Sequence, residues 1–329
     1  MAKPKRSALR ESLDRRKAVQ SGAMLNLEQR LDELSENLAR RLGAVLGIDP
    51  DDVYAPDGSD GVRVGATNFE TAIDGLNDPD RVKAAVLASS LDEIGEFVEA
   101  SGMDRARNVM RDSMAELAGL AERSATAAGV VGADGALDTA AASALLGNYI
   151  DNRITGDLFG IMTARSAARI RIGLESNLGL MSLTEVAQSI GSAEQAAIPA
   201  TITEARTTLA EGDRFANEVV RESVDPDGED TLLAYLGPDD GITRDFCSHL
   251  VNKAFEINDF AAANNHQTPT HPRYSGGGYN CRHDVTPVPN SPAALAALGM
   301  EKGTANDVAQ ASSAALAARK KKKKRKRKR

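Results

Sequence analysis

The chain has 329 residues, two cysteines, four histidines, no tryptophan and a formal net charge of −7. This length suffices for two domains, or for one large domain with tails. Two cysteines exclude a disulfide scaffold, and no apolar run approaches the roughly 20 residues that cross a bilayer, which excludes a membrane partner. Because the basic start lacks the apolar core of a secretory signal, we expect the protein to be made in a reducing cytoplasm.

The charge is strongly asymmetric. Eleven consecutive cations occupy residues 319–329, and without them 29 Lys and Arg face 47 Asp and Glu. Residues 1–318 therefore carry a formal charge of about −18, so that only the tail indicates a nucleic-acid partner. Adjacent cations repel one another, which predicts a disordered polybasic tail that binds DNA phosphates without sequence selectivity. The predicted DNA-binding residues are Arg319, Lys320, Lys321, Lys322, Lys323, Lys324, Arg325, Lys326, Arg327, Lys328 and Arg329.

The N-terminal segment is also basic. Residues 1–22 contain seven Lys and Arg and predict a polar N-terminal arm. Beyond it, residues 23–150 predict a helical region of unknown role. From Leu27 to Leu42 the leucines recur every three or four residues, which places them on one face of an amphipathic helix. A coiled-coil contact between copies of the chain, hence a homo-oligomer, is an alternative interpretation of that face.

The rest of this helical region alternates loops and helices. Residues 50–66 are rich in Pro, Gly and Asp and predict a loop. Helical patterns follow at 69–77, 81–100 and 103–128, and an alanine-rich stretch covers 134–150.

Long helices are predicted over residues 151–225, in particular over about 151–176 and 193–223. Between them, Ser182 and Glu185 have the spacing of a capping box, in which each residue's side chain accepts a hydrogen bond from the other's backbone N–H. This capping box predicts the start of a short helix that ends near residue 190.

The character of the sequence changes after Asp225. Dense turn residues and short apolar stretches such as 231–236 predict a small α+β module over residues 226–290. Small, alanine-rich residues predict a linker over 291–318, with a weak helix near 305–318. The predicted fold class is mainly α, with a small α+β Cys/His-bearing module near the C-terminus and a disordered basic tail.

Both cysteines and all four histidines lie between Cys247 and His283. A Cys-x-His tripeptide occurs twice, at Cys247 to His249 and at Cys281 to His283. In a strand, residues two apart point to the same face, so each tripeptide would offer a thiolate and an imidazole together. Because two such pairs make a tetrahedral zinc site, the sequence predicts these four residues as zinc ligands.

Other interpretations of the same cluster remain. His271 or His266 could replace either histidine as a ligand. A disulfide between the two cysteines and plain core packing are further alternatives. The neighbouring acidic residues 239–245 predict turns rather than a hydrolytic site.

The segment Gly276–His283 reads GGGYNCRH. It resembles the signature that closes the phage head morphogenesis domain of minor head proteins of the Mu F-like and SPP1 gp7-like kind. Three upstream stretches are similar to further parts of that domain: residues 179–190, 205–207 and 239–247. The resemblance covers roughly residues 160–289 and makes 151–225 the helical part of the domain.

The resemblance implies a non-enzymatic minor capsid protein that acts with the portal and the major capsid protein in head assembly, DNA packaging or ejection. It places the protein in the virion, in the head interior or portal region, after assembly in the host cytoplasm. The matching signature residues are Gly277, Gly278, Asn280 and Arg282. The glycines allow a sharp turn, and Arg282 could pair with a carboxylate or a partner.

Two other classes of function are considered. A metal-dependent nuclease or toxin-type enzyme would use a metal and histidines such as His266, His271 and His283 to activate water. A scaffold-like assembly factor would place its basic tail on acidic capsid or portal surfaces and would be absent from the mature virion. A nicking assay tests the first class, and the composition of purified virions tests the second.

Overall fold

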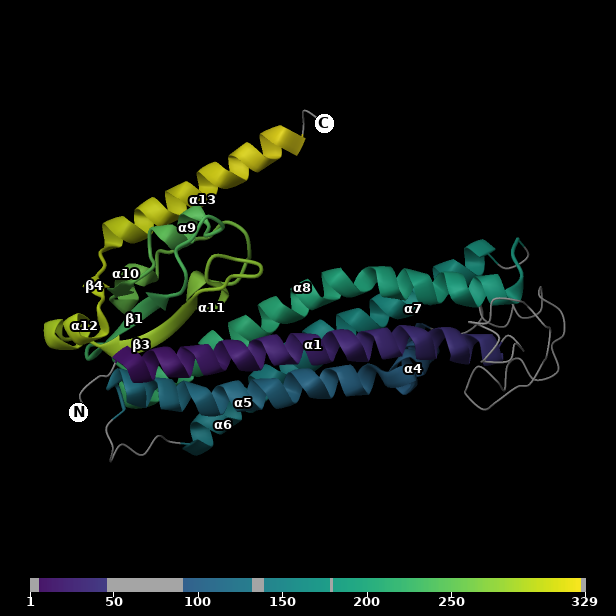
Figure 1. Cartoon of the computed structure of the whole chain (residues 1–329), viewed down its shortest axis with the longest axis horizontal. Helices are drawn as coiled ribbons and strands as arrows, with labels where there is room; N and C mark the ends of the chain where they lie inside the picture. Colours follow the sequence, from purple (N-terminus) through teal and green to yellow (C-terminus); the bar gives the residue numbers. More distant parts are fainter. Residues whose placement is uncertain (1–5, 46–90, 132–138, 178–179, 327–329) are drawn as a thin grey trace. The chain divides into compact units, whose positions relative to one another are not determined.

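The computed structural model describes residues 6–45, 91–131, 139–177 and 180–326 (Figure 1). The chain divides into two compact units. The first comprises Met1–Ala23, Arg111–Arg153 and Thr203–Arg329, and the second comprises Met24–Met110 and Ile154–Ile202. Three long helices contribute residues to both units.

The second unit is built of helices. Its elements are the later part of α1 (Arg6–Val45), α4 (Leu91–Val98), the π-helical segment η2 (Glu99–Met103), the start of α5 (Asp104–Ala128), the later part of the π-helical segment η3 (Ile150–Gly160), α7 (Ile161–Asn177) and the first part of α8 (Leu183–Val224). The leucines of α1 from Leu27 to Leu42 are all buried, which confirms the predicted apolar face. Helix α4 packs against α7 and buries Ile94 and Phe97.

Helix α8 differs from its prediction in continuity. The sequence predicts a short helix to residue 190 and a second one from 193, whereas α8 runs unbroken and contains Pro199. The predicted capping box is confirmed: the Ser182 N–H donates to Glu185 Oε2 at 2.8 Å, and the Glu185 N–H donates to Ser182 Oγ at 3.3 Å. Helix α5 matches the helix predicted over 103–128 to within one residue. The predicted loop at 50–66 and helix at 69–77 lie outside the described residues.

The predicted polar arm is wrong for residues 6–22, because these residues form the first part of α1. Within this part, Leu9 is 3% exposed and Arg16 is 1% exposed. Ala, Leu, Arg and Glu favour helix, and the buried guanidinium finds carboxylates in the first unit, so the basic segment packs instead of remaining in solvent. Residues 1–5 lie outside the described part of the chain.

A small sheet lies at the centre of the C-terminal part of the first unit (Figure 1). Its strands are β1 (Thr231–Leu236), β2 (Lys253–Phe255), β3 (Asp284–Pro289) and β4 (Glu301–Lys302), in the order β3-β1-β2-β4. Strand β1 pairs antiparallel with both β2 and β3, and β2 pairs parallel with β4. All six residues of β1 are buried, and the strand predicted over 231–236 is confirmed.

One-turn helices connect these strands. They are α9 (Asp245–Ser248), α10 (Ile257–Phe260) and α11 (Pro272–Ser275). The first unit also contains α6 (Thr139–Tyr149).

The predicted linker over 291–318 is wrong, but the weak helix predicted near 305–318 is confirmed as part of α13. This stretch forms α12 (Pro292–Leu298), β4 and most of α13 (Ala305–Lys326). Ser291 caps α12 by accepting the Ala294 N–H at 3.1 Å, and Thr304 caps α13 by accepting the Asp307 N–H at 3.3 Å. Good caps and alanine-rich sequence favour helix here. Helix α13 continues through the cationic run to Lys326, where a disordered tail was predicted.

The predicted fold class is otherwise confirmed. The chain is mainly helical, and both cysteines lie in segments that flank the strands of a small sheet near the C-terminus. In the part of the chain that the structure describes, no helix combines the length and the apolar character that crossing a membrane requires.

Candidate functional site: a buried Cys/His cluster and an exposed cationic helix

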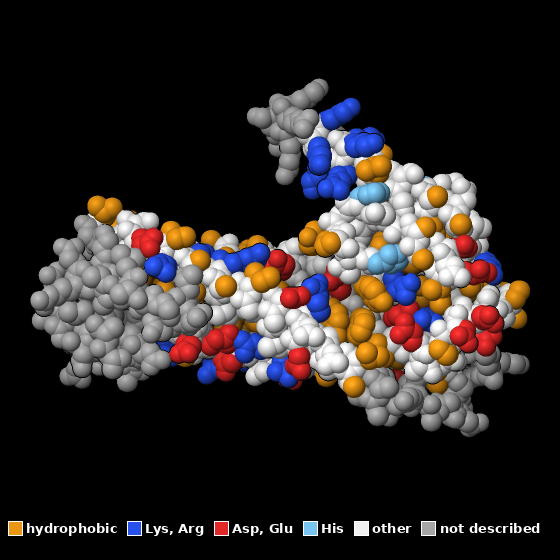
Figure 2. All heavy atoms as spheres, turned by 180° about the vertical axis from the view of Figure 1, so that it is seen from behind, with side chains coloured by type: hydrophobic (Ala, Val, Ile, Leu, Met, Phe, Trp, Pro, Cys, Tyr) orange, Lys and Arg blue, Asp and Glu red, His pale blue; other side chains and the backbone are white. Residues whose placement is uncertain are grey.

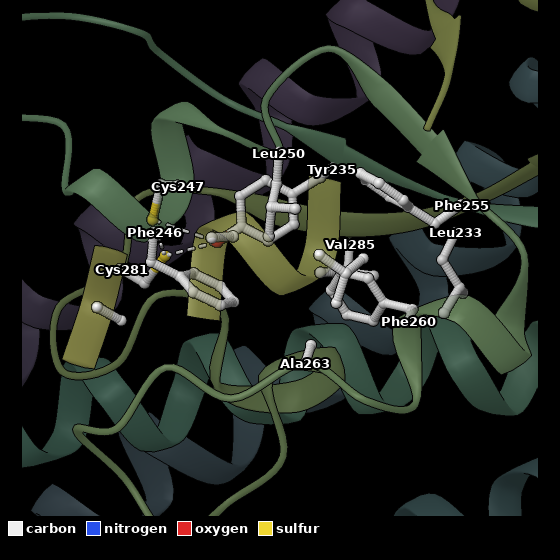
Figure 3. Close-up of a cluster of buried hydrophobic side chains, with 13 residues drawn as sticks. Leu233, Tyr235, Phe246, Cys247, Leu250, Phe255, Phe260, Ala263, Cys281 and Val285 are labelled. Carbon is white, nitrogen blue, oxygen red and sulfur yellow. Dashed lines mark hydrogen bonds between the residues drawn. The ribbon is translucent and has the colours of Figure 1, made fainter. Parts of the chain in front are cut away.

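The two cysteines meet in the hydrophobic core around the sheet. Helix α9 supplies Cys247, and the segment before β3 supplies Cys281 and His283. Figure 3 shows the two sulfur atoms facing each other beside the hydroxyl of Tyr235, which comes from β1. The surrounding core is contributed by Leu233, Phe246, Leu250, Phe255, Phe260, Ala263, Val285, Val308, Ala311 and Ala315. The last three of these belong to α13, so the helix that carries the cationic run is anchored in the same core as the cysteines.

The distances describe a converging group of three side chains. The two Sγ atoms are 3.9 Å apart, far longer than the roughly 2.05 Å of a disulfide bond, and both cysteines are free. Cys281 Sγ lies 3.8 Å from His283 Nδ1. The two Sγ atoms and one ring nitrogen of His283 all lie within 4.8 Å of one another, and the three residues are buried.

The imidazole of His283 is also held by contacts of its second ring nitrogen, Nε2, and of its ring face. Its Nε2 lies 2.8 Å from the carbonyl oxygen of Pro238, and its ring stacks on that of Tyr235 with centroids 5.3 Å apart. A carbonyl can only accept a hydrogen bond, so Nε2 carries the proton. In the neutral ring, Nδ1 is then left with a lone pair that points at the sulfur atoms.

The two thiols have opposite acidities. The hydrogen bond from Cys247 lowers the pKa of Cys281 well below the usual value, and His283 and the charge of Arg214 act in the same direction. The same hydrogen bond and burial raise the pKa of Cys247. Burial also raises the pKa of Tyr235. Cys281 Sγ also accepts a hydrogen bond from the Gly277 N–H at 3.0 Å.

Glycine residues leave the space in which the two sulfur atoms and the imidazole approach one another. A Cβ on Gly277 would overlap Cys247 Sγ, so the backbone can pass the two sulfur atoms only without a side chain. Gly237 has φ +157°, and a Cβ there would stand 2.6 Å from His283 Cδ2. The predicted sharp turn before Cys281 is present as well, with Gly278 at φ +100°.

The predicted four-ligand site is wrong in one residue, His249, whereas His283 lies with the two cysteines. Cys247 lies on a one-turn helix and not on a strand, and residues two apart on a helix diverge by about 200°. His249 therefore follows α9 without joining the group around the sulfurs. His271 caps α11, accepting the Arg273 N–H, and its Nε2 contacts the Ala261 carbonyl. His266, with φ +54°, is also outside the group.

Arg214 organises the signature segment and was missed by the sequence analysis. From α8, its buried guanidinium donates hydrogen bonds to the carbonyl oxygens of Tyr274 at 2.7 Å, Cys281 at 3.2 Å and His283 at 2.6 Å. Nothing in its local sequence distinguishes it from the other arginines of that helix. Its role depends on a backbone segment about 60 to 70 positions away in the chain.

The other signature residues have structural contacts. Arg282 points to the surface and forms a bidentate ion pair with the carboxylate of Asp240, with N–O distances of 2.7 and 2.9 Å. This ion pair lowers the pKa of Asp240. Asn280 has φ +54°, and its N–H donates to Thr207 Oγ1 at 3.2 Å. The Asp240 carbonyl accepts the N–H of Thr243, so the acidic stretch forms a turn as predicted.

The cationic run has a different setting. Residues 319–324 lie on the free end of α13 and are all exposed, and Figure 2 shows Lys and Arg side chains gathered there. Within the described ranges, none of these six side chains forms an ion pair with a carboxylate. Six cations spaced along about two helical turns present a concentrated positive surface to solvent.

Comparison of the chain with models of protein families, with curated proteins and with solved structures gives no match. The resemblance to the phage head morphogenesis domain therefore rests on the residues of the sequence alone.

Proposed function

We propose that the chain is a minor head protein of the phage head morphogenesis type, which contacts packaged DNA through the cationic end of α13. The main supporting observation is that the six cations at residues 319–324 are exposed and form no ion pair with a carboxylate of the described residues. Each Lys or Arg that neutralises a phosphate releases a condensed counterion, which gives affinity without sequence selectivity. The acidic remainder of the chain, about −18 by formal charge, disfavours DNA binding elsewhere.

The signature segment supports this proposal through its structural role. Cys281 lies in the core that also holds Val308 and Ala311 of α13, and Gly277 lies against the sulfur atoms of this core. A module of this kind provides a rigid base from which a cationic helix extends. In the proposed function, the base associates with the portal or the major capsid protein, and the helix reaches the genome inside the head.

The DNA-binding part is tested with the full chain and a variant that lacks residues 319–329. A random-sequence duplex is titrated in an electrophoretic shift assay at moderate salt. We expect the full chain to retain the duplex and the deletion variant to lose retention while keeping the circular dichroism of a folded helical body, because residues 319–324 are exposed. Equal retention by the two proteins contradicts DNA binding through the tail.

The virion part is tested by mass spectrometry of purified particles from the phage or prophage that encodes the chain. We expect the protein in mature particles at a few copies. Its presence in immature heads alone would identify a scaffold-like assembly factor instead. Metal-dependent nicking of plasmid by the purified chain, abolished by His283→Ala, would identify an enzyme and overturn the proposal.

A further inference from the structure

We propose that Cys247, Cys281 and His283 bind one zinc ion, with the hydroxyl of Tyr235 at the fourth position, and that the ion stabilises the α+β module. This site differs from the four-residue site expected from sequence, because it takes one histidine instead of two. It also goes beyond the proposed contact with DNA, since none of its ligands lies in the cationic run.

The distances fit a tetrahedral ion. Zinc binds sulfur at about 2.3 Å and imidazole nitrogen at about 2.0–2.1 Å, so tetrahedral angles separate two sulfurs by about 3.8 Å and a sulfur from a nitrogen by about 3.6 Å. The observed separations are 3.9 Å between the sulfurs and 3.8 Å between Cys281 Sγ and His283 Nδ1. Two sulfur atoms in simple contact lie about as far apart, so it is the third ligand and its orientation that distinguish a metal site from packing.

The orientation of the His283 ring is fixed by a hydrogen bond of the ring nitrogen that does not face the sulfur atoms. A zinc-binding imidazole usually donates its other N–H to a carboxylate or carbonyl, which settles the tautomer and aims the ring. His283 does so through Nε2 and the Pro238 carbonyl at 2.8 Å. The Gly277 N–H, 3.0 Å from Cys281 Sγ, likewise donates to the atom that would bear the charge of a metal-bound thiolate.

The fourth position is occupied by a hydroxyl. The hydroxyl oxygen of Tyr235 lies 3.3 Å from Cys247 Sγ and 3.7 Å from Cys281 Sγ. An oxygen and a sulfur on one tetrahedral zinc ion are separated by about 3.6 Å, and the two observed distances lie on either side of this value. All four donors are buried in the module, so the site is closed and belongs to the structural type.

Charge favours the same ion. Binding moves both thiol protons to solvent, whereas His283 offers a lone pair and loses no proton. Two thiolates and one divalent cation form a site without net charge, which avoids the large cost of burying two uncompensated thiolates. Two sulfurs and one imidazole are borderline-soft donors and select zinc over calcium or magnesium.

The glycines give the site its shape. A Cβ on Gly276 would stand 2.7 Å from Cys281 Sγ, and a Cβ on Gly277 would overlap Cys247 Sγ. Replacing Gly277 by alanine therefore disturbs the ligands without removing any of them. Gly241 is the matched control, because nothing lies within 4 Å of the position its Cβ would take.

The experiment measures metal on the full chain, purified under reducing conditions without chelator and dialysed against zinc. We expect about one zinc per chain by elemental analysis, and loss of most of it in Cys247→Ser, Cys281→Ser and His283→Gln. His249→Gln and His271→Gln should keep the wild-type content, since neither histidine reaches the sulfurs. Gly277→Ala should lose zinc, and Gly241→Ala should retain it.

Cobalt titration of the unaltered chain avoids variants that fail to fold. We expect saturation at about one Co²⁺ per chain, with the visible bands of tetrahedral cobalt, an ultraviolet thiolate-to-cobalt band, and displacement by Zn²⁺. Absence of both bands with both thiols reduced would overturn the proposal. So would zinc content that survives in the Cys247→Ser, Cys281→Ser double variant, or a Cys247–Cys281 disulfide in the protein isolated from cells.

Discussion

Residues 6–22 and residues 319–324 are both rich in Lys and Arg and both helical, but their cations have different surroundings. In the N-terminal segment, Arg16 is 1% exposed and donates to Asp213 Oδ1 at 2.9 Å and to Asn217 Oδ1 at 2.9 Å. It also lies 3.3 Å from the carboxylate of Asp284, the first residue of β3. At the other end, residues 319–324 are exposed, and no described carboxylate pairs with them.

The difference shows that positive charge in a sequence serves two separate purposes in this chain. A buried guanidinium surrounded by two carboxylates is part of the fold, and removing it leaves an uncompensated charge in the core. An exposed cation contributes almost nothing to stability. In residues 319–324, where no acidic residue stands among the cations, each cation can add one phosphate contact, whereas Glu11 and Asp14 stand among the exposed cations of the N-terminal segment. Among the N-terminal cations, the buried Arg16 should therefore affect folding, whereas the exposed C-terminal cations should affect binding.

The largest effect on stability is expected from Arg16→Met, which keeps the length of the side chain and removes its charge. Asp213 and Asn217 then lose their partner inside the core, and we expect the free energy of unfolding to fall by about 3–5 kcal/mol. Urea denaturation followed by circular dichroism measures this. Arg15→Met is the matched control because Arg15 is exposed, and it should shift the free energy by less than about 0.5 kcal/mol. Equal changes in the free energy of unfolding for the two substitutions would contradict the distinction between buried and exposed basic residues.

A pH series tests the same cluster from the acidic side. Burial raises the pKa of Asp213 to about 6, with Arg16 opposing and Asp284 adding to the rise. An Asp in the unfolded chain titrates near 3.9, so the folded state holds the proton to higher pH. The contribution of Asp213 is therefore greatest below about pH 4 and is lost as pH rises to about 6.

We expect the free energy of unfolding to show this downward component between about pH 4 and pH 6, and Asp213→Asn to remove it. Urea midpoints at several pH values measure the slope in both proteins. The slope of the free energy of unfolding against pH is the quantity to compare, because the substitution also changes the free energy of unfolding itself. An unchanged slope in Asp213→Asn would place the titration elsewhere.

A smaller effect is expected where α13 begins. Thr304 and Asp307 form a capping box: the Thr304 N–H donates to Asp307 Oδ2 at 2.9 Å, and the Asp307 N–H donates to Thr304 Oγ1 at 3.3 Å. Thr304→Ala should lower the free energy of unfolding by about 1 kcal/mol, whereas Thr304→Ser should retain the cap. Denaturation of both variants decides whether the base of the cationic helix is held by this cap. Equal losses in the two would show that the hydroxyl does not act as a cap.

Much of the regular structure could be predicted, and for physical reasons. The period of the leucines from Leu27 to Leu42 matches the helical repeat, and all are buried. The Ser182 to Glu185 spacing defines a helix start in any context. The caps at Ser291 and Thr304 carry the same kind of local signal. The cap at Ser291 identifies α12 where composition had indicated a linker, and the cap at Thr304 marks the start of α13, which had been predicted as a weak helix.

What could not be predicted depends on distant partners. Arg16 looks like its charged neighbours in the sequence, and its burial follows from Asp213, 197 positions away. Arg214 is similarly defined by carbonyl oxygens of the signature segment. Of the four expected zinc ligands, His249 is not brought to the sulfurs, because Cys247 lies on a helical turn and the alternation of a strand does not apply there.

The central claim, that the DNA contact resides in the cationic end of α13, is tested most directly by the salt dependence of DNA affinity in two charge-matched triple variants. One carries Lys320→Gln, Lys321→Gln and Lys322→Gln, and the other carries Arg10→Gln, Arg15→Gln and Lys17→Gln, all six positions being exposed. We expect the slope of log affinity against log salt to fall by about 3 in the first and to keep its wild-type value in the second. A slope that falls in the N-terminal variant and not in the C-terminal one would contradict the account.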